Sequence, residues 1–347
     1  MNLIYGSICG SIYGAAVGDA MGAATETRSA EMIREHFGGW VDDLLLPPND
    51  CFAHGCPAGS VTDDFSLAYF IALELIACKG QMNEAAAKRA VLSWAEHPEF
   101  TRFAGPTTMA AIQMMRGEAP AIHQENTLVL ACDNMKATNG ASMKIFPVGL
   151  IHPDDLDGAI RDTITVCMPT HANNASISGA CAISSAVAKA LKPCATLDDV
   201  IRAGIYGAGE GLKIGSKLAA RLAVASVEKR IKLAVEIGRC GLGWEKTMLE
   251  LRDVIGSGLA VTESVPCVFG ILAANPGDLF SAIKMGVNIG NDTDTVATMV
   301  GAVGGALYGE SNIPDRFFSI IEHVNHMDLH KIADGLYRIQ ENTPYSA

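Results

Sequence analysis

Basic residues, aromatic residues and long apolar runs are all scarce in this 347-residue chain. Its 26 Lys and Arg against 38 Asp and Glu give a formal net charge of −12, which repels nucleic acid and argues against a general DNA or RNA binder. The longest apolar candidates, 177–191 and 296–308, fall short of the about 20 residues that a membrane span needs. The first apolar run has no basic flank, so we expect no signal peptide and a cytoplasmic protein without membrane partners.

The chain also lacks any CxxC pair, although it contains ten cysteines. In a cytosolic protein, scattered cysteines are mostly small buried hydrophobic residues. The densest group is CFAHGC, in which Cys51, His54 and Cys56 offer three zinc ligands without an obvious fourth. We therefore expect a solvent-facing loop there rather than a metal site.

Small side chains are abundant instead. Hydrophobic residues make up 49% of the chain, aromatic residues only 6%, and there are 35 glycines. Glycine recurs at positions 6, 10, 14, 18 and 22, a spacing that places all five on one helix face. Each glycine costs a helix about 1 kcal/mol relative to alanine. We therefore expect a second helix to pack closely on this bare ridge.

Helical periodicity dominates the chain, and no segment has a convincing strand period of two. This pattern predicts an all-α fold in a single domain, 1–347, of a dozen or more helices. The first two expected helices are 4–22 and 62–78, the second with Thr62 as its N-cap. Further helices are expected over 83–95, 106–116, 154–167, 174–192, 197–206, 212–237, 244–254, 277–287, 294–308, 315–324 and 329–340.

Three acidic clusters stand out: GDAMGAATE with Asp19 and Glu26, TDD at 62–64, and DTDT at 292–295. The last two precede strongly apolar helices. One carboxylate is enough to complement a helix dipole, so a second beside it suggests a bound cation. Carboxylate and threonine oxygens suit Mg²⁺ or Mn²⁺. If TDD and DTDT meet in space, their four carboxylates would suit two divalent ions; otherwise both are helix caps that face water.

Five motifs, in this order, resemble the ADP-ribosylglycohydrolase family, which includes the enzyme that reactivates ADP-ribosylated dinitrogenase reductase: GDAMGAATE, TDDFSLA, TNGASMKIFPVGL, PTHANNASISGA and NIGNDTDTVATMVGAVGGALYG. They extend from Gly18 to Gly309. The resemblance implies a single-domain orthogonal helical bundle with two divalent cations, Mg²⁺ or Mn²⁺, in a cleft. By motif position it also implies a set of metal ligands: Thr62, Asp63, Asp64, Asp292, Asp294 and Thr295.

The same resemblance implies an activity and its residues. Glu26 matches the family's acidic residue over the metals, and either Glu26 or Asp63 is expected to take the proton from the attacking water. The residues expected to bind substrate are Asn139, Gly140, Ser142, Met143 and His171. The implied reaction is hydrolysis of the N- or O-glycosidic bond of an ADP-ribosylated protein or small molecule, which releases ADP-ribose.

Three positions depart from the family pattern. Lys144 stands where the family usually has arginine, Asn291 where it has glycine, and Phe65 where it has Thr or Ser. No expected ligand is lost, but a nucleoside or other ribosyl metabolite becomes the alternative substrate. A catalytically inactive ADP-ribose binder is less favoured, because all six ligands are retained. Asp19 is expected to be structural, bonding to a neighbouring loop.

Overall fold

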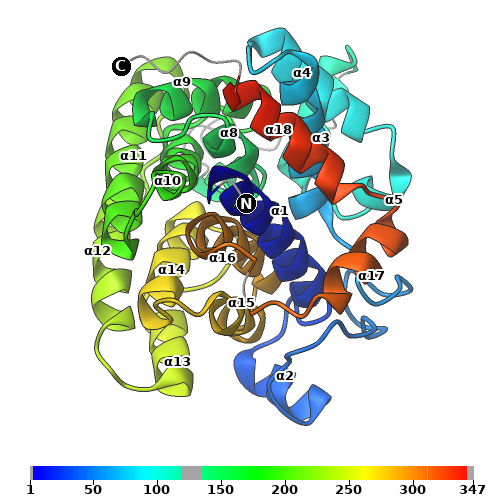
Figure 1. Cartoon of the computed structure of the whole chain (residues 1–347), viewed down its shortest axis with the longest axis vertical. Coiled ribbons are helices and arrows are strands. Elements are labelled where there is room, and N and C mark those ends of the chain that lie inside the picture. The colour runs from blue at the N-terminus through cyan, green and yellow to red at the C-terminus, as the bar shows by residue number, and fades with distance from the viewer. Residues whose placement is uncertain (1–2, 119–133, 311, 342–347) are drawn as a thin grey trace.

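The computed structural model describes residues 3–118, 134–310 and 312–341. Across this part the regular structure is helical, and β pairing is limited to isolated bridges. The prediction of an all-α fold is confirmed (Figure 1). The helices are α1 (Leu3–Gly22), α2 (Ala30–Phe37), α3 (Asp63–Ala77), α4 (Glu84–Trp94), α5 (Pro98–Thr101), α6 (Pro106–Met115), η1 (Asn134–Lys136), η2 (Asn139–Ala141), α8 (Phe146–Leu150), α9 (Leu156–Cys167), α10 (Asn174–Ala190), α11 (Leu197–Leu218), α12 (Val227–Gly238), α13 (Trp244–Val254), α14 (Val261–Ala274), α15 (Leu279–Asn288), α16 (Thr293–Tyr308), α17 (Arg316–Asn325) and α18 (Leu329–Glu341).

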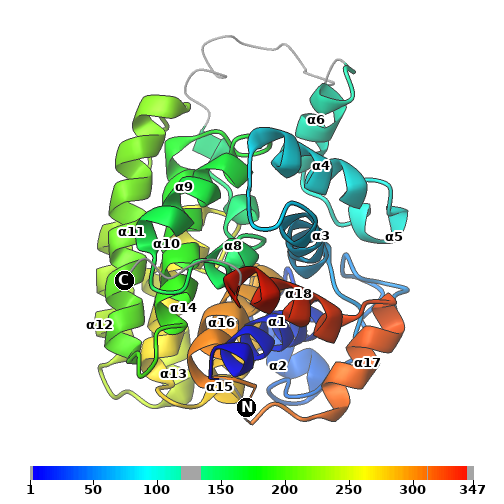
Figure 2. The same cartoon turned by 45° about the horizontal axis from the view of Figure 1, so that its top comes forward.

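Helices α1 and α16 lie side by side at the centre of the molecule (Figures 1 and 2). Gly14 of α1 sits against the backbone of Gly301, and Gly22 sits against the backbone of Asp294, with no room for a Cβ on either glycine. Gly6 has open space around it and is the exception. The prediction that a helix packs on the glycine ridge is therefore confirmed. We call this contact the glycine seam, formed by Gly10, Gly14, Gly18, Gly22, Gly301 and Gly305.

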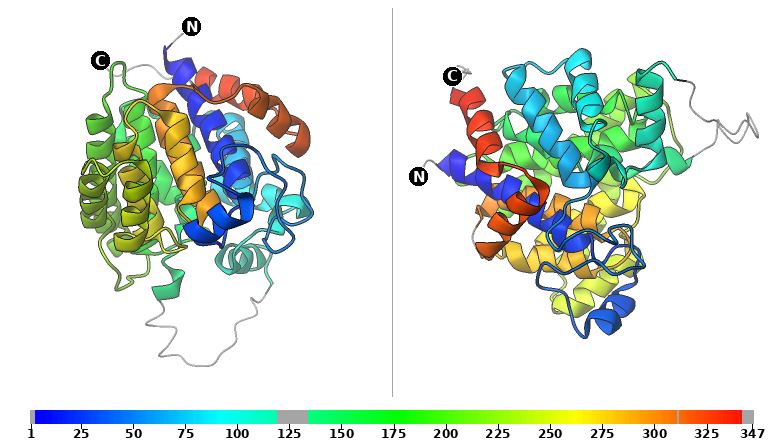
Figure 3. Two further views of the ribbon diagram at one scale, coloured as in Figure 1. Left: turned by 90° about the horizontal axis from the view of Figure 1, so that it is seen from below. Right: turned by 90° about the vertical axis from the view of Figure 1, so that its right-hand side faces the viewer.

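Helix α10 forms a second hub of the core. It contacts α8, α9, α11, α14 and α16, and of its residues only Lys189 is not buried. Helices α11 and α12 form the outer wall on the side of the molecule that holds α10, and α3, α4 and α18 lie on the opposite side (Figure 3). No helix in the described ranges is both long and apolar enough to cross a membrane.

The predicted helix 212–237 is wrong, and the predicted helix 197–206 is too short. One helix, α11, runs to Leu218, and the chain then turns before α12 begins after the N-cap Ser226. The two predicted helices left a gap at 207–211, but in the structure Gly207 and Gly211 lie against Cys181 of α10, where a larger side chain would not fit. These glycines allow close helix packing instead of ending the helix.

Helix α14 was not predicted. It carries Pro266 in its interior, and nearly every one of its residues is buried, so it has no polar face to reveal a period. The short helices α2, α5 and α8 were also missed. Each is too brief for periodicity to identify.

Candidate metal centre

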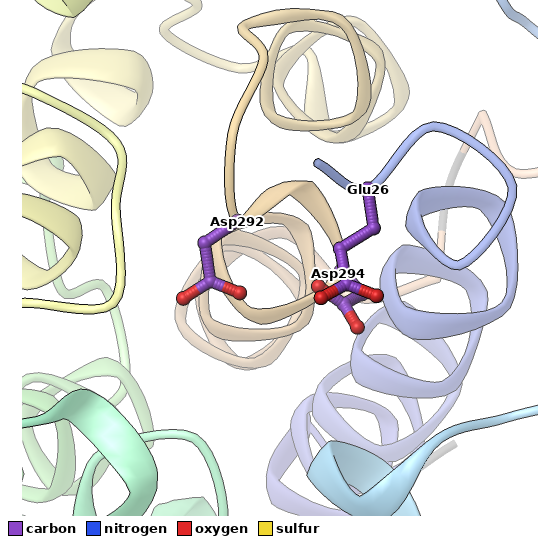
Figure 4. A group of neighbouring side chains, drawn as sticks. All are labelled: Glu26, Asp292 and Asp294. Atoms are coloured by element: carbon purple, nitrogen blue, oxygen red, sulfur yellow. The ribbon is translucent and has the colours of Figure 1, made fainter. Parts of the chain in front are cut away.

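Carboxylates from two distant segments meet at the N-terminus of α16. Oxygen atoms of Glu26, Asp292 and Asp294 all lie within 4.8 Å of one another (Figure 4). Asp292 and Asp294 are buried, whereas Glu26 is half-buried. Within the ranges that the structure describes, no other group of three Asp, Glu, His or Cys side chains is this compact.

A short backbone pairing holds Glu26 beside Asp292. The Thr27 amide donates to the Asn291 carbonyl, and the Asn291 amide donates to the Arg28 carbonyl, each at 2.7 Å. Asn291 has φ +68°, a left-handed conformation that glycine adopts freely and asparagine tolerates better than most residues. The replacement of the family's glycine by Asn291 is therefore compatible with this backbone.

Helix α3 brings the TDD cluster to the same place. Thr62 is the N-cap, and its hydroxyl donates to Asp64 Oδ2 at 3.0 Å. The other oxygen of this carboxylate, Oδ1, is buried without a hydrogen-bond partner. A buried oxygen of this kind is costly unless something binds it, and a divalent cation satisfies that need. Asp63 is half-buried beside it.

The pKa values of the cluster reflect burial and mutual repulsion. Burial, followed by the negative charges of Asp292 and Asp63, raises the pKa of Glu26 to about 8. Burial and the neighbouring acids also raise the pKa of Asp63 to about 8. The pKa values of Asp64 and Asp294 are raised well above their ordinary range by burial first and by neighbouring carboxylates second. The four groups are not all ionised near neutral pH unless a cation offsets their charge.

Helix capping does not explain the DTDT cluster. Asp292 is the N-cap of α16 by position, yet its side chain makes no capping hydrogen bond. Its Oδ2 instead accepts from the Asn139 side chain at 2.6 Å. Burial raises the Asp292 pKa, and the Asn139 bond opposes that shift. The reading of this cluster as a water-facing cap is therefore wrong for Asp292 and Asp294, which are both buried.

Asp19 makes the structural contacts expected of it. Both of its carboxylate oxygens lie 3.0 Å from the Thr62 amide, and Oδ2 also accepts from the Phe65 amide at 2.9 Å. Burial raises its pKa to about 7, although these bonds lower it. Asp19 thus links α1 to the start of α3 through these backbone hydrogen bonds, which fix the orientation of the TDD segment.

The loop expected to bind substrate borders the acid cluster. Asn139 connects the two directly through Asp292, and a Cβ added to Gly140 would lie 2.7 Å from His171 Nε2. Ser142 and Met143 are buried, and the Ser142 hydroxyl has no hydrogen-bond partner. Thr295 lies in the first turn of α16, where its amide donates to Asp294 Oδ1 at 3.0 Å. The structure thus places the expected metal ligands, the expected proton acceptors and the loop expected to bind substrate near the N-terminus of α16.

Sequence reasoning marked Lys144 as a departure from the family pattern without giving it a structural role, and it missed Thr170. Lys144 is fully buried, and its Nζ donates to Thr170 Oγ1 at 2.9 Å. The charged residue within the apolar stretch KIFPVGL was the available signal for Lys144. Nothing in the sequence singled out Thr170.

The CFAHGC segment does not form a zinc site in the described structure. His54 Nδ1 lies 3.1 Å from the Cys51 carbonyl, and Cys56 Sγ accepts from Arg102 at 3.5 Å. These three residues do not meet as a ligand group.

The chain is similar in sequence or fold to several known proteins. The ADP-ribosylglycohydrolase family model matches residues 2–345. The uncharacterised protein YegU of Escherichia coli (strain K12) is 29% identical over 319 residues, 89% of this chain and 90% of YegU. Human ADP-ribosylhydrolase ARH3 is 31% identical over 103 residues, which cover 27% of this chain and 28% of ARH3. A solved ADP-ribosylglycohydrolase-related protein complex superposes with a TM-score of 0.68 at 19% identity, over 98% of this chain and 100% of that one, which shows a common fold.

Proposed function

Because the chain belongs to the ADP-ribosylglycohydrolase family, we propose that it is a glycohydrolase that uses two divalent cations to release ADP-ribose from a modified protein or small molecule. The family is hydrolytic, and its members act on ADP-ribosylated substrates. The single observation that carries the proposal for this chain is the acid cluster, since carboxylate oxygens of Glu26, Asp292 and Asp294 converge within 4.8 Å of one another.

The residues fit Mg²⁺ or Mn²⁺. The donor set consists of carboxylate and hydroxyl oxygens, and it includes Asp64 Oδ1, which is buried and unpartnered. The proposed ligands are Thr62, Asp63, Asp64, Asp292, Asp294 and Thr295. Bound divalent ions would supply Lewis-acid chemistry, orienting a water and lowering its pKa.

The proposed roles of the chain's own residues follow from their surroundings. Glu26 and Asp63 are half-buried while the other carboxylates are closed off, so these two are the candidates to accept the proton of the attacking water. Without metal the pKa values of both groups are raised to about 8, and bound cations would lower them again by offsetting the neighbouring negative charge. The carboxylates also stabilise positive charge at the sugar carbon as the glycosidic bond breaks. Asn139 holds Asp292 in place.

A hydrolysis panel tests the substrate class. Purified protein with Mg²⁺ or Mn²⁺ is given ADP-ribosyl-arginine, ADP-ribosyl-serine, O-acetyl-ADP-ribose and several ribonucleosides, and the released sugar is identified. We expect free ADP-ribose. Release of ribose alone would favour the nucleoside hydrolase, and binding of ADP-ribose without turnover of any substrate would favour the inactive binder.

Asp294→Asn separates the metal site from the fold. Without metal, this change removes one member of a crowded acid cluster, so we expect the variant to melt at or above the wild-type temperature in EDTA. With Mn²⁺ at about 100 times its dissociation constant, the wild type should gain about 2.7 kcal/mol of stability, and the variant should gain much less. Turnover should be lost.

The matched control is Asp315→Asn, at an exposed aspartate whose side chain makes no capping bond. It should keep both the Mn²⁺-induced shift and the activity. An Asp294→Asn protein that is fully active in the presence of a chelator would rule out the proposed metal role.

A further inference from the structure

A buried hydrogen-bonded chain runs from Lys144 through Thr170 to His171. The Lys144 ammonium is 0% exposed, and its acceptor among the described residues is Thr170 Oγ1, at 2.9 Å. An ammonium group has three protons to donate and no acceptor. The Thr170 oxygen therefore accepts in this bond.

The Thr170 hydroxyl has one proton of its own, and it lies 2.9 Å from His171 Nδ1. No other acceptor for this hydroxyl exists within the described part of the chain, so its proton points to Nδ1. Burial, and then the charge of Lys144, lowers the pKa of His171 well below its ordinary value, so the ring carries a single proton. With Nδ1 accepting, that proton resides on Nε2.

The Nε2 atom faces the loop beside the acid cluster. A Cβ on Gly140 would lie 2.7 Å from Nε2, so only a glycine leaves this nitrogen uncovered. The neighbouring Asn139 bonds to Asp292 of the acid cluster at 2.6 Å. A donor at this position is suited to an acceptor oxygen of a ligand, such as that of a phosphate or a sugar hydroxyl.

We propose that Lys144 and Thr170 are positioning residues that hold His171 as the Nε2–H tautomer, so that His171 offers a hydrogen-bond donor beside Gly140. Only the identity of the ligand that accepts a hydrogen bond from Nε2–H rests on the proposed function. The cost of the arrangement supports a role beyond packing. A buried ammonium held by one neutral hydroxyl is expensive, and a methionine would fill the same volume without that cost.

Neither of the neighbouring titratable groups, Cys167 and Asp63, forms a hydrogen bond with Lys144 in the described structure. Cys167 packs nearby, but burial raises the pKa of its thiol to about 12, so it is uncharged near neutral pH. Asp63 attracts Lys144 electrostatically, and no hydrogen bond joins the two side chains. The bond to Thr170 is the directional contact of the Lys144 side chain.

Long-range ¹H–¹⁵N NMR on full-length protein with ¹⁵N-labelled histidine reads the tautomer directly, with His171→Gln used to assign the signals. We expect the wild type to show a protonated Nε2 and an unprotonated Nδ1. Thr170→Val should lose this single-tautomer pattern, and Thr170→Ser should retain it. Thr165→Val is the matched control, because the Thr165 hydroxyl bonds only to the Arg161 carbonyl within α9, and it should leave the pattern unchanged.

Lys144→Met provides an independent test, since it removes the positive charge that, by bonding to Thr170 Oγ1, disfavours a second donation to this oxygen from Nδ1. This variant should also mix the two tautomers while the protein remains folded. A wild-type ring protonated on Nδ1, or Thr170→Val and Lys144→Met spectra that both match the wild type, would overturn the inference.

Titration of ADP-ribose into the same samples distinguishes this inference from the proposed function. We expect the wild-type Nε2 signal to shift, and Thr170→Val to bind ADP-ribose about tenfold more weakly, with recovery in Thr170→Ser. An Nε2–H tautomer that is present but unaffected by ADP-ribose would support the positioning role and contradict the proposed substrate class.

Discussion

Crowded negative charge dominates the chemistry of single residues in this protein. Glu26, Asp63 and Asp294 share one small region with Asp64 and Asp292, and all five have raised pKa values. Each raised pKa means that the folded metal-free protein retains protons that the unfolded chain would release. Proton binding and folding are therefore linked, and the pH dependence of stability is a measure of the cluster.

We predict that metal-free protein loses stability as the pH rises from about 4 to about 8. Ordinary carboxylates have pKa values of about 4 in the unfolded chain, whereas Asp19 is raised to about 7 and Glu26 and Asp63 to about 8. In this window the folded state binds more protons, so the free energy of unfolding falls with rising pH. Lys144, whose lowered pKa is about 8, acts in the opposite direction above that range, and the single group His171, whose pKa burial lowers well below its ordinary value, opposes the trend below about pH 6.5.

Urea unfolding in EDTA at about pH 5, 6.5 and 8 measures the slope. Glu26→Gln should flatten it, because one of the titrating groups is gone. Saturating Mn²⁺ should weaken or reverse the slope, since a cation favours the ionised carboxylates. A metal-free protein whose stability rises with pH across this window would contradict the raised pKa values that we attribute to burial and repulsion among the carboxylates.

Sequence reasoning named the candidate site residues by their motifs but not the contacts between them. Asp64 and Asp292 were recognised as candidate ligands, yet their 228-residue separation meant that only the folded chain could bring them together. The Lys144–Thr170–His171 chain was beyond prediction for another reason. Hydrogen-bond partners that are distant in sequence leave no periodic trace, and a lone threonine has many possible roles.

At the scale of helices, backbone contact between α1 and α16 positions the site. The glycine seam continues to Gly22, which lies against the backbone of Asp294. The packing of α1 on α16 therefore determines the position of the Asp294 carboxylate. Thr293 reinforces this end, because its hydroxyl donates to the Gly22 carbonyl at 3.1 Å. The end of α1, whose following turn carries Glu26, is thus held against the start of α16, which carries Asp294.

Gly14→Ala should destabilise the protein, by about 1–3 kcal/mol from forced separation of the two helices. Gly6→Ala is the matched control on the same face of the same helix, where a Cβ meets nothing within 4 Å. It should be neutral, or stabilising by up to about 1 kcal/mol through helix propensity. Chemical unfolding of both variants gives the comparison, and equal effects at the two positions would show that the seam is not tightly packed.

Sequence patterns predicted most of the longer helices, including α10 and α16, which are almost entirely buried. Both ends of α18 and the C-terminal end of α12 were located to within a few residues, while α14, buried around Pro266, was not predicted. The predicted gap within α11 was wrong, because Gly207 and Gly211 pack against α10 inside one continuous helix. Tertiary contact, not local preference, decided these cases.

At the scale of the whole molecule, the ends of the described chain are packed together. Helix α1 contacts α16, α17 and α18, and α18 also contacts α3 (Figure 2). The N-terminal helix is therefore enclosed by the C-terminal ones. This arrangement favours the single domain, 1–347, that we propose.

We predict one cooperative thermal transition, because α1 and α16 lie at the centre of the fold and the other helices pack against them or against their neighbours. Differential scanning calorimetry in EDTA should give a calorimetric enthalpy close to the van't Hoff value. The same single transition should move to higher temperature with Mn²⁺. Two resolved transitions, with only one shifted by metal, would indicate separate folding units.

The glycine seam also sets the limits of mutational drift in this protein. Glycine has no smaller substitute, so any replacement at Gly14 or Gly301 adds atoms where the opposing backbone already lies. A neighbouring change cannot compensate, because the obstacle is main chain and not a side chain that could be trimmed. Positions around the acid cluster do not face this constraint, so they can vary while the seam behind them stays fixed. Under the proposed function, the scaffold can thus change its substrate without moving its carboxylates.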